Sequence, residues 1–169
     1  FDEMWKGVSP AGTIEAHEIP AKPLDPYSYY NGDFIALEKA HLNKGWKLVD
    51  NWHPDNKAGK RNGFVDVPML EATRPGDRLT LDFHGKAIGI FCVSGPSAGI
   101  LEYSIDGAPF KELDTFTEWS HNLYIPWVYM LETELKDMDH KLVLRISKKK
   151  NPASQGTECQ IRNFVVNGR

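Results

Sequence analysis

The sequence predicts an all-β protein, an antiparallel β-sandwich of the jelly-roll type. Apolar and polar residues alternate in eight or more short segments, and Gly, Pro, Asp and Asn separate these segments. Such alternation indicates strands that are buried on one face, and many short strands joined by turns are typical of sandwiches and barrels. No segment has the spacing of a useful amphipathic helix, and no repeat indicates a propeller or solenoid.

The first residues differ from the rest of the chain. Residues 1–7 (FDEMWKG) place Phe1, Met4 and Trp5 at helical spacing before a glycine, which predicts the end of a helix from a preceding domain. Residues 8–32 hold four of the eleven prolines, which predicts an extended Pro-rich linker. We expect the sandwich over residues 33–169. Because the chain begins with Phe rather than Met, we expect it to be a piece of a longer protein.

Two hairpins are predicted within the sandwich. Residues 78–85 (RLTLDFHG) and 87–93 (AIGIFCV) alternate on either side of a Gly85-Lys86 turn. Residues 100–107 (ILEYSIDG) alternate and end at Asp106-Gly107, which favours positive φ angles and a tight turn before residues 109–114. Further strands are predicted at residues 46–51, 63–72, 123–135, 141–147 and 158–166. Pro68 places the second of these at a sheet edge or a bulge.

The composition excludes several classes of protein. The formal net charge is −3 with mixed signs along the chain, so no basic surface predicts nucleic-acid binding. No apolar stretch is long enough to span a bilayer, and no signal peptide is recognisable. Cys92 and Cys159 lie in strand-like segments, where they would form one disulfide or remain unpaired in the core. Residues 94–99 (SGPSAG) lack the lysine and helix of a phosphate loop, so they predict a sharp link that passes close to a neighbouring segment.

One motif resembles part of a catalytic triad. Asp50 and His53 lie in D-x-x-H-P, a spacing by which serine esterases hold their aspartate and histidine. The sequence has no G-x-S-x-G and no Gly-Asp-Ser, and a polar turn rather than a helix follows Pro54. We therefore interpret the motif as the end of a strand and a turn.

Aromatic residues beside polar ones form a second candidate site. Sugar rings present flat C–H faces, so their binding sites combine aromatic planes with amide, carboxylate or guanidinium groups. Two segments have this mixture, and the predicted ligand-binding residues are Trp52, His53, Arg61, Trp119, His121 and Tyr124. Trp46 is assigned to the core instead. The acids near His140 suit a turn better than a metal site, so neither a metal nor a cofactor is predicted.

Three sequence runs resemble the jelly-roll accessory domain of SGNH (GDSL-type) hydrolases, which has a galactose-binding-like fold. They are F-x-G-x-A-I-G-I at residues 83–90, Y-S-I-D-G at 103–107 and H-x-L-x-L-x-I at 140–146. Many of these hydrolases are bacterial carbohydrate esterases. The resemblance implies that the catalytic domain lies upstream of this chain, that no catalytic residue lies within it, and that the protein is periplasmic or extracellular.

Three functions follow from these observations. The first is a noncatalytic C-terminal accessory domain of an SGNH-type esterase, which packs on its own catalytic domain and binds glycan. The second is an independent carbohydrate-binding module. The third, which the sequence favours least, is an esterase that uses Asp50 and His53.

Overall fold

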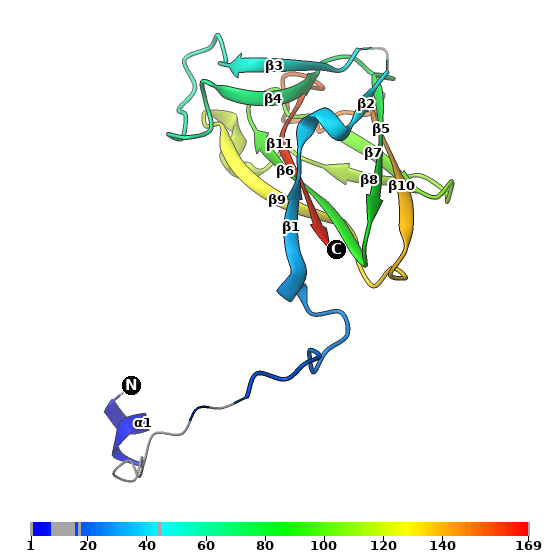
Figure 1. The fold of residues 1–169 in the computed structure, drawn as a ribbon. Helices are drawn as coiled ribbons and strands as arrows, with labels where there is room; N and C mark the ends of the chain where they lie inside the picture. The colour runs from blue at the N-terminus through cyan, green and yellow to red at the C-terminus, as the bar shows by residue number, and fades with distance from the viewer. Residues whose placement is uncertain (1, 8–15, 17, 44, 169) are drawn as a thin grey trace.

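The computed structural model describes residues 2–7, 16, 18–43 and 45–168, with the side chains of Met4 and Trp5 left out. Within them the chain forms two antiparallel sheets packed as a sandwich (Figure 1). The strands are β1 (Gly32–Ile35), β2 (His41–Leu42), β3 (Lys47–Trp52), β4 (Val67–Ala72), β5 (Arg78–His84), β6 (Ala87–Ser94), β7 (Ile100–Ile105), β8 (Lys111–Asp114), β9 (Ile125–Glu132), β10 (Asp139–Ile146) and β11 (Cys159–Asn167). The helical elements are α1 (Asp2–Lys6), η1 (Tyr29–Asn31), η2 (Leu37–Lys39) and η3 (Glu118–His121).

The order of the strands confirms the predicted jelly-roll sandwich. One sheet has the order β3-β4-β11-β6-β9, with β1 also paired to β11, and the other has the order β2-β5-β10-β7-β8. From β4 to β11 the chain crosses between the sheets repeatedly, so strands that are close in sequence face each other across the core. Central β6 and β11 are buried along most of their length.

The core is formed by the alternating apolar residues. Leu79, Leu81 and Phe83 point inward from β5, and Leu142 and Leu144 do so from β10, where they pair with Leu81 and Leu79. The core cluster extends to residues of both sheets, since burial of both inner faces removes the most apolar surface from water. Trp46 is buried in this cluster, as predicted.

The predicted hairpin at Gly85-Lys86 is wrong. β5 pairs with β2 and β10, whereas β6 pairs with β9 and β11 in the other sheet. The amide groups of the turn bond outside it, since Gly85 N–H donates to Met138 O at 3.1 Å and Lys86 N–H to Asn167 O at 2.7 Å. Alternation identifies the inward residues but does not distinguish pairing within one sheet from facing across the core.

The other local predictions agree with the structure. β7 and β8 pair as a hairpin, and Asp106 and Gly107 have the expected positive φ angles of 52° and 79°. Pro68 lies at a register shift between β3 and β4, which is the predicted bulge. The link at residues 94–99 passes close to its neighbours, because a Cβ on Gly95 would lie 2.1 Å from the Tyr124 ring.

Cys92 and Cys159 are buried free thiols, which answers the question that the sequence left open. Cys92 pairs with Ile161 across β6 and β11, so Cys159 is two residues further along the neighbouring strand. Burial raises the pKa of Cys92 to about 12 and raises that of Cys159 well above its ordinary value. Both cysteines therefore act as small core residues.

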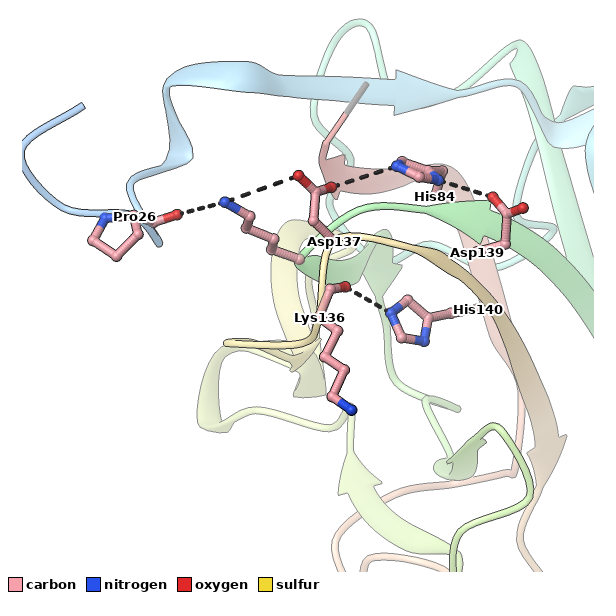
Figure 2. A network of polar contacts seen from close by, with 7 residues as sticks. Pro26, His84, Lys136, Asp137, Asp139 and His140 are labelled. Atoms are coloured by element: carbon pink, nitrogen blue, oxygen red, sulfur yellow. Dashed lines mark hydrogen bonds and ion pairs between the residues drawn. The ribbon is translucent and has the colours of Figure 1, made fainter. Parts of the chain in front are cut away.

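The segment before β1 is attached to the sandwich at the ends of β5, β6 and β11. Lys86 Nζ donates to Pro26 O at 3.0 Å, and Asn167 Nδ2 donates to Ser28 O at 3.0 Å. Beside Lys86, the His84 ring lies between two carboxylates, 3.4 Å from Asp137 Oδ1 and 2.9 Å from Asp139 Oδ1 (Figure 2). We call this group of Pro26, Ser28, His84, Lys86, Asp137, Asp139 and Asn167 the connector corner.

The first residues of the chain are described only in part. Asp2–Lys6 is helical, as the residue spacing indicates. Phe1, the side chains of Met4 and Trp5, and residues 8–15 and 17 of the predicted linker lie outside the described residues. The domain boundaries at residues 7 and 32 therefore stay a prediction. Among the described residues, none of the helices has the length and apolar character needed to cross a membrane.

Candidate functional site

The structure joins the two segments that the sequence proposed separately. Gly59 N–H donates to Asn122 O at 2.7 Å, and Tyr124 N–H donates to Gly59 O at 2.8 Å. Asn56 Nδ2 also donates to the Tyr124 hydroxyl at 2.7 Å. The loop after β3 and the segment before β9 therefore form one surface, although 68 positions separate Asn56 from Tyr124.

A pocket of about 340 Å³ lies at this end of the sandwich, and we call it the end pocket. Trp52 comes from the end of β3, Glu71 from β4, Gln160 from β11 and Tyr124 from the residue before β9. The complete lining is Trp52, His53, Pro54, Asp55, Asn56, Glu71, Ser97, Tyr124, Glu158 and Gln160. Its size suits one or two sugar units rather than a flat polymer surface.

Two aromatic rings form the inner wall of the end pocket. Trp52 and Tyr124 are 3% and 4% exposed, and their rings meet edge to face with centroids 5.5 Å apart. Trp52 Nε1 donates to Glu71 Oε1 at 3.0 Å. Gly95 allows the Tyr124 ring to pack directly on its backbone. Trp52 is thus a fixed wall of the pocket and not an exposed plane on which a sugar could stack.

The buried polar groups of the end pocket keep hydrogen-bonding capacity. Gln160 is 2% exposed and donates to Glu158 Oε2 at 3.3 Å, while its Oε1 accepts no hydrogen bond from the described residues. The Tyr124 hydroxyl accepts from Asn56, and within the described residues its own proton has no acceptor. Gln160 Oε1 is not among the fully enclosed polar atoms that lack a partner, so it is reached from the pocket, where it and the Tyr124 hydroxyl can bond a polar ligand.

The carboxylates of the pocket have different surroundings. Glu71 accepts from Trp52 and forms an ion pair with Lys47 at 2.9 Å, so both of its oxygens are occupied. Burial raises the pKa of Glu158, the nearby Glu71 adds to the rise, and the hydrogen bond from Gln160 opposes it. Burial also raises the pKa of Tyr124, which keeps its hydroxyl protonated and able to donate.

The predicted histidine has a different partner from the one its motif suggests. His53 Nδ1 lies 2.9 Å from Asp66 Oδ1, and the structure records no bond between His53 and Asp50. Both side chains of the His53 pair are about half exposed. Among the described residues no serine or cysteine is hydrogen-bonded to the His53 ring. The geometry thus supplies a surface ion pair rather than a nucleophile and its base.

The remaining predicted residues, Arg61, Trp119 and His121, do not line the pocket. Trp119 is 61% exposed on η3, and the His121 ring meets Phe116 edge to face at 5.1 Å. Thr117 and Ser120 form a capping box that holds η3. Arg61 is exposed two residues after Gly59. Trp119 therefore offers an exposed aromatic plane in the segment that leads to Tyr124.

Among the pocket residues that sequence reasoning missed are Glu71, Ser97, Glu158 and Gln160. Glu71, Glu158 and Gln160 lie within or next to strands whose apolar positions drew attention to the core. The local signal is weak, because Gln160 stands between the apolar Cys159 and Ile161 in a strand that also contains Arg162 and Asn163. Gln160 meets Glu71 because β11 pairs with β4, and that pairing is not visible in either segment alone.

A metal centre finds no support in the described part of the chain, where no group of three or more His, Cys, Asp or Glu side chains is arranged to hold an ion. A wider groove of about 830 Å³ lies beside the connector corner and includes Tyr30, Phe34, His41 and Asp82. It is broad and open, and Asp82 and His84 already form ion pairs with His41, Lys141 and Asp137. The end pocket is the better candidate because its buried polar groups still have free capacity.

Comparisons with known proteins place this fold among carbohydrate-active enzymes. The sequence matches no protein-family model and no curated protein sequence. A two-domain esterase active on acetylated mannans, crystallised with mannopentaose, has a similar structure at a TM-score of 0.59 and 16% identity. The match covers 92% of this chain and 41% of that chain. In fold, this chain resembles part of a two-domain esterase. The resemblance found in the sequence is thereby confirmed for the fold.

Two further solved structures share the fold at a TM-score of 0.50. An exo-β-1,3-galactanase from Phanerochaete chrysosporium, with galactose, is 11% identical, and the match covers 79% of this chain and 29% of that chain. A Paenibacillus xanthan lyase is 17% identical, with 93% of this chain and 14% of that chain covered. This chain thus spans less than half the length of each of these three proteins.

Proposed function

We propose that this chain is a noncatalytic β-sandwich accessory domain of an SGNH-type esterase that acts on carbohydrate, and that the end pocket holds part of the glycan. The observation that carries the proposal is the free hydrogen-bonding capacity of Gln160 and Tyr124, both buried, in a pocket walled by Trp52. A polyhydroxylated ligand would satisfy both groups at once. The carbohydrate-active enzymes of similar fold support the choice of ligand.

The proposed accessory role includes a partner. We propose that the domain packs on its own catalytic domain upstream in the full-length chain, and that the protein is periplasmic or extracellular. The support is that the similar esterase has two domains and that this fold covers 41% of it. The exposed Trp119, His121 and Arg61 would contact either the glycan beyond the pocket or the catalytic domain.

Affinity electrophoresis of this chain in gels that contain neutral polysaccharides tests the binding. We expect mannan, or another neutral polysaccharide, to retard the protein, and Tyr124→Phe and Gln160→Ala to abolish the retardation while circular dichroism shows an intact fold. Gln155→Ala is the matched control, because the side chain of Gln155 is exposed and lies outside the pocket. Normal migration in every neutral polysaccharide would contradict the glycan-binding role.

Hydrolysis assays test the noncatalytic part of the proposal. We expect this chain to release no acetate from acetylated mannan and no phenol from aryl acetates above the buffer rate. The pairing of His53 with Asp66 supports this expectation. Turnover that His53→Ala removes would instead establish an esterase centred on His53.

An independent carbohydrate-binding module is the second candidate, because every residue of the end pocket belongs to the sandwich. The two candidate functions predict different catalytic rates for the full-length protein on a polymeric substrate. An accessory domain should raise the catalytic rate on polymeric substrate but not on a small aryl ester, since only a polymer can reach both domains. Equal cleavage of the polymer with and without the sandwich would favour an independent module.

A further inference from the structure

The end pocket carries negative and not positive side chains. Three carboxylates line it, from Asp55, Glu71 and Glu158, and no lysine or arginine does so among the described residues. Lys47 is bound to Glu71 Oε2, and Arg61 does not line the pocket. The imidazole of His53 also lines the pocket, but it is paired with Asp66, so a ligand meets the carboxylates of Asp55 and Glu158, which are unpaired within the described residues.

The hydrogen-bonding groups of the end pocket also favour an uncharged ligand over an anionic one. Gln160 Oε1 and the carboxylates of Glu158 and Asp55 accept, while the hydroxyls of Tyr124 and Ser97 and the amide NH2 groups of Asn56 and Gln160 are able to donate. Sugar hydroxyl groups donate and accept, so they match both sets. A carboxylate on a sugar only accepts, so Gln160 Oε1 and the carboxylates of Glu158 and Asp55 could form no hydrogen bond with it.

Charge repulsion adds to this mismatch. Glu71 is one-sixth exposed and Gln160 is almost fully buried, so a bound carboxylate would lose much of its water. Like charges repel more strongly in such surroundings than in bulk water, and an uncompensated anion there is costly to bury.

We infer that the end pocket selects glycans by charge: it binds uncharged sugar units and rejects uronic acids through the unpaired carboxylates of Glu158 and Asp55. The inference rests on the proposed glycan binding and adds the class of ligand. Selectivity of this kind comes from an unfavourable contact with the wrong ligand as well as from favourable contacts with the right one.

The test compares two ligands that differ only at carbon 6. β-1,4-Mannopentaose and β-1,4-pentamannuronate share their backbone and ring configuration, and the second carries a carboxylate in place of each hydroxymethyl group. We expect isothermal titration calorimetry to give a Kd for mannopentaose at least about tenfold lower than that for pentamannuronate. Equal or tighter binding of the uronate would overturn the inference while leaving the glycan-binding function in place. Binding of neither ligand would overturn the inference, and together with normal migration in every neutral polysaccharide it would also contradict the glycan-binding function.

A pair of variants tests whether the carboxylate causes the selectivity. Glu158→Gln keeps the shape of the side chain and an oxygen that can accept from Gln160, but it removes the charge. The tenfold ratio of the two dissociation constants should therefore fall to about threefold or less. Glu118→Gln is the control, since Glu118 is an exposed residue of η3 outside the pocket. A ratio that Glu158→Gln leaves unchanged would overturn the inference.

Discussion

The two ends of β11 are both polar, but they use their polar groups differently. At the connector corner, His84 contacts Asp137 and Asp139, and Asn167 donates to Ser28 O. At the end pocket, Gln160 and Tyr124 are buried with unused hydrogen-bonding capacity. Polar groups that bond to one another hold the fold, whereas buried groups with unused capacity are suited to a ligand.

One atom of the connector corner differs from its neighbours. Asn167 Oδ1 is buried and has no partner among the described residues. It is fully enclosed, whereas Gln160 lines a pocket that a ligand can enter. A polar group is therefore suited to a ligand only where it has unused hydrogen-bonding capacity and can also be reached from outside the protein.

The largest expected effect is a difference in the free energy of unfolding between variants of Trp52, which lines the end pocket, and of the exposed Trp119. Trp52→Ala should lower the free energy of unfolding by about 3–5 kcal/mol, because it leaves a cavity beside Tyr124 and frees Glu71. Trp119→Ala should change it by less than about 0.5 kcal/mol, since Trp119 is 61% exposed. Urea denaturation measures both. Similar losses in the two variants would contradict the description of Trp52 as a fixed wall.

A smaller, pH-dependent effect is expected beside the connector corner. His140 Nδ1 lies 2.6 Å from Asp106 Oδ2, and His140 Nε2 donates to Lys136 O at 2.9 Å (Figure 2 shows the second contact). Burial acts to lower the pKa of His140, but Asp106 and the Lys136 carbonyl outweigh it and raise the pKa above 6.5. The hydrogen bond from His140 lowers the pKa of Asp106 below 3.8, against the effect of burial.

These two shifts set the pH range in which the pair stabilises the protein. The contribution of His140 is complete below pH 6.5 and is lost as pH rises through its raised folded value. The contribution of Asp106 is present above pH 3.8 and is lost as pH falls through its lowered folded value. Asp106→Asn should therefore cost about 1 kcal/mol near pH 5.5 and less near pH 8.5, since Asp106 is half exposed and partly screened.

Denaturation at the two pH values measures this difference, with Asp50→Asn as the control. Asp50 is exposed and takes part in no ion pair or hydrogen bond within the described residues. A cost for Asp106→Asn that is equal at both pH values would show that the pair does not titrate as described.

The smallest effect concerns the attachment of the connector. Lys86→Ala removes the bond to Pro26 O and the contact with Asp137, and the exposed location limits the loss to under about 0.5 kcal/mol. Hydrogen exchange of residues 25–31 should nevertheless become faster, because Asn167 alone would then hold this segment through a side-chain bond. Lys39→Ala is the control. Unchanged exchange in Lys86→Ala would show that Lys86 does not hold the segment.

The sequence predicted local features well because local chemistry decides them. Asp106-Gly107 forms the expected turn, Pro68 lies at the expected bulge, and Trp46 is buried as predicted. Each depends on φ preferences or on alternation within a few residues. The Gly85-Lys86 hairpin was wrong because the partner of a strand is decided elsewhere in the chain.

The candidate site was predicted only in part, for the same physical reason. Trp52, His53 and Tyr124 were identified by residue type, and the structure places all three in the end pocket. Their convergence depends on the backbone bonds of Gly59 to Asn122 and Tyr124, which join distant segments.

By itself, the sequence determined that the chain forms an antiparallel sandwich, which residues face its core and which aromatic residues stand beside polar ones. The tertiary structure alone decided which strands pair, and so it brought Gln160 beside Glu71 and Glu158 at the entrance to a pocket. Alternation is a property of one strand, whereas a binding site depends on which strands become neighbours when both sheets bury their inner faces together.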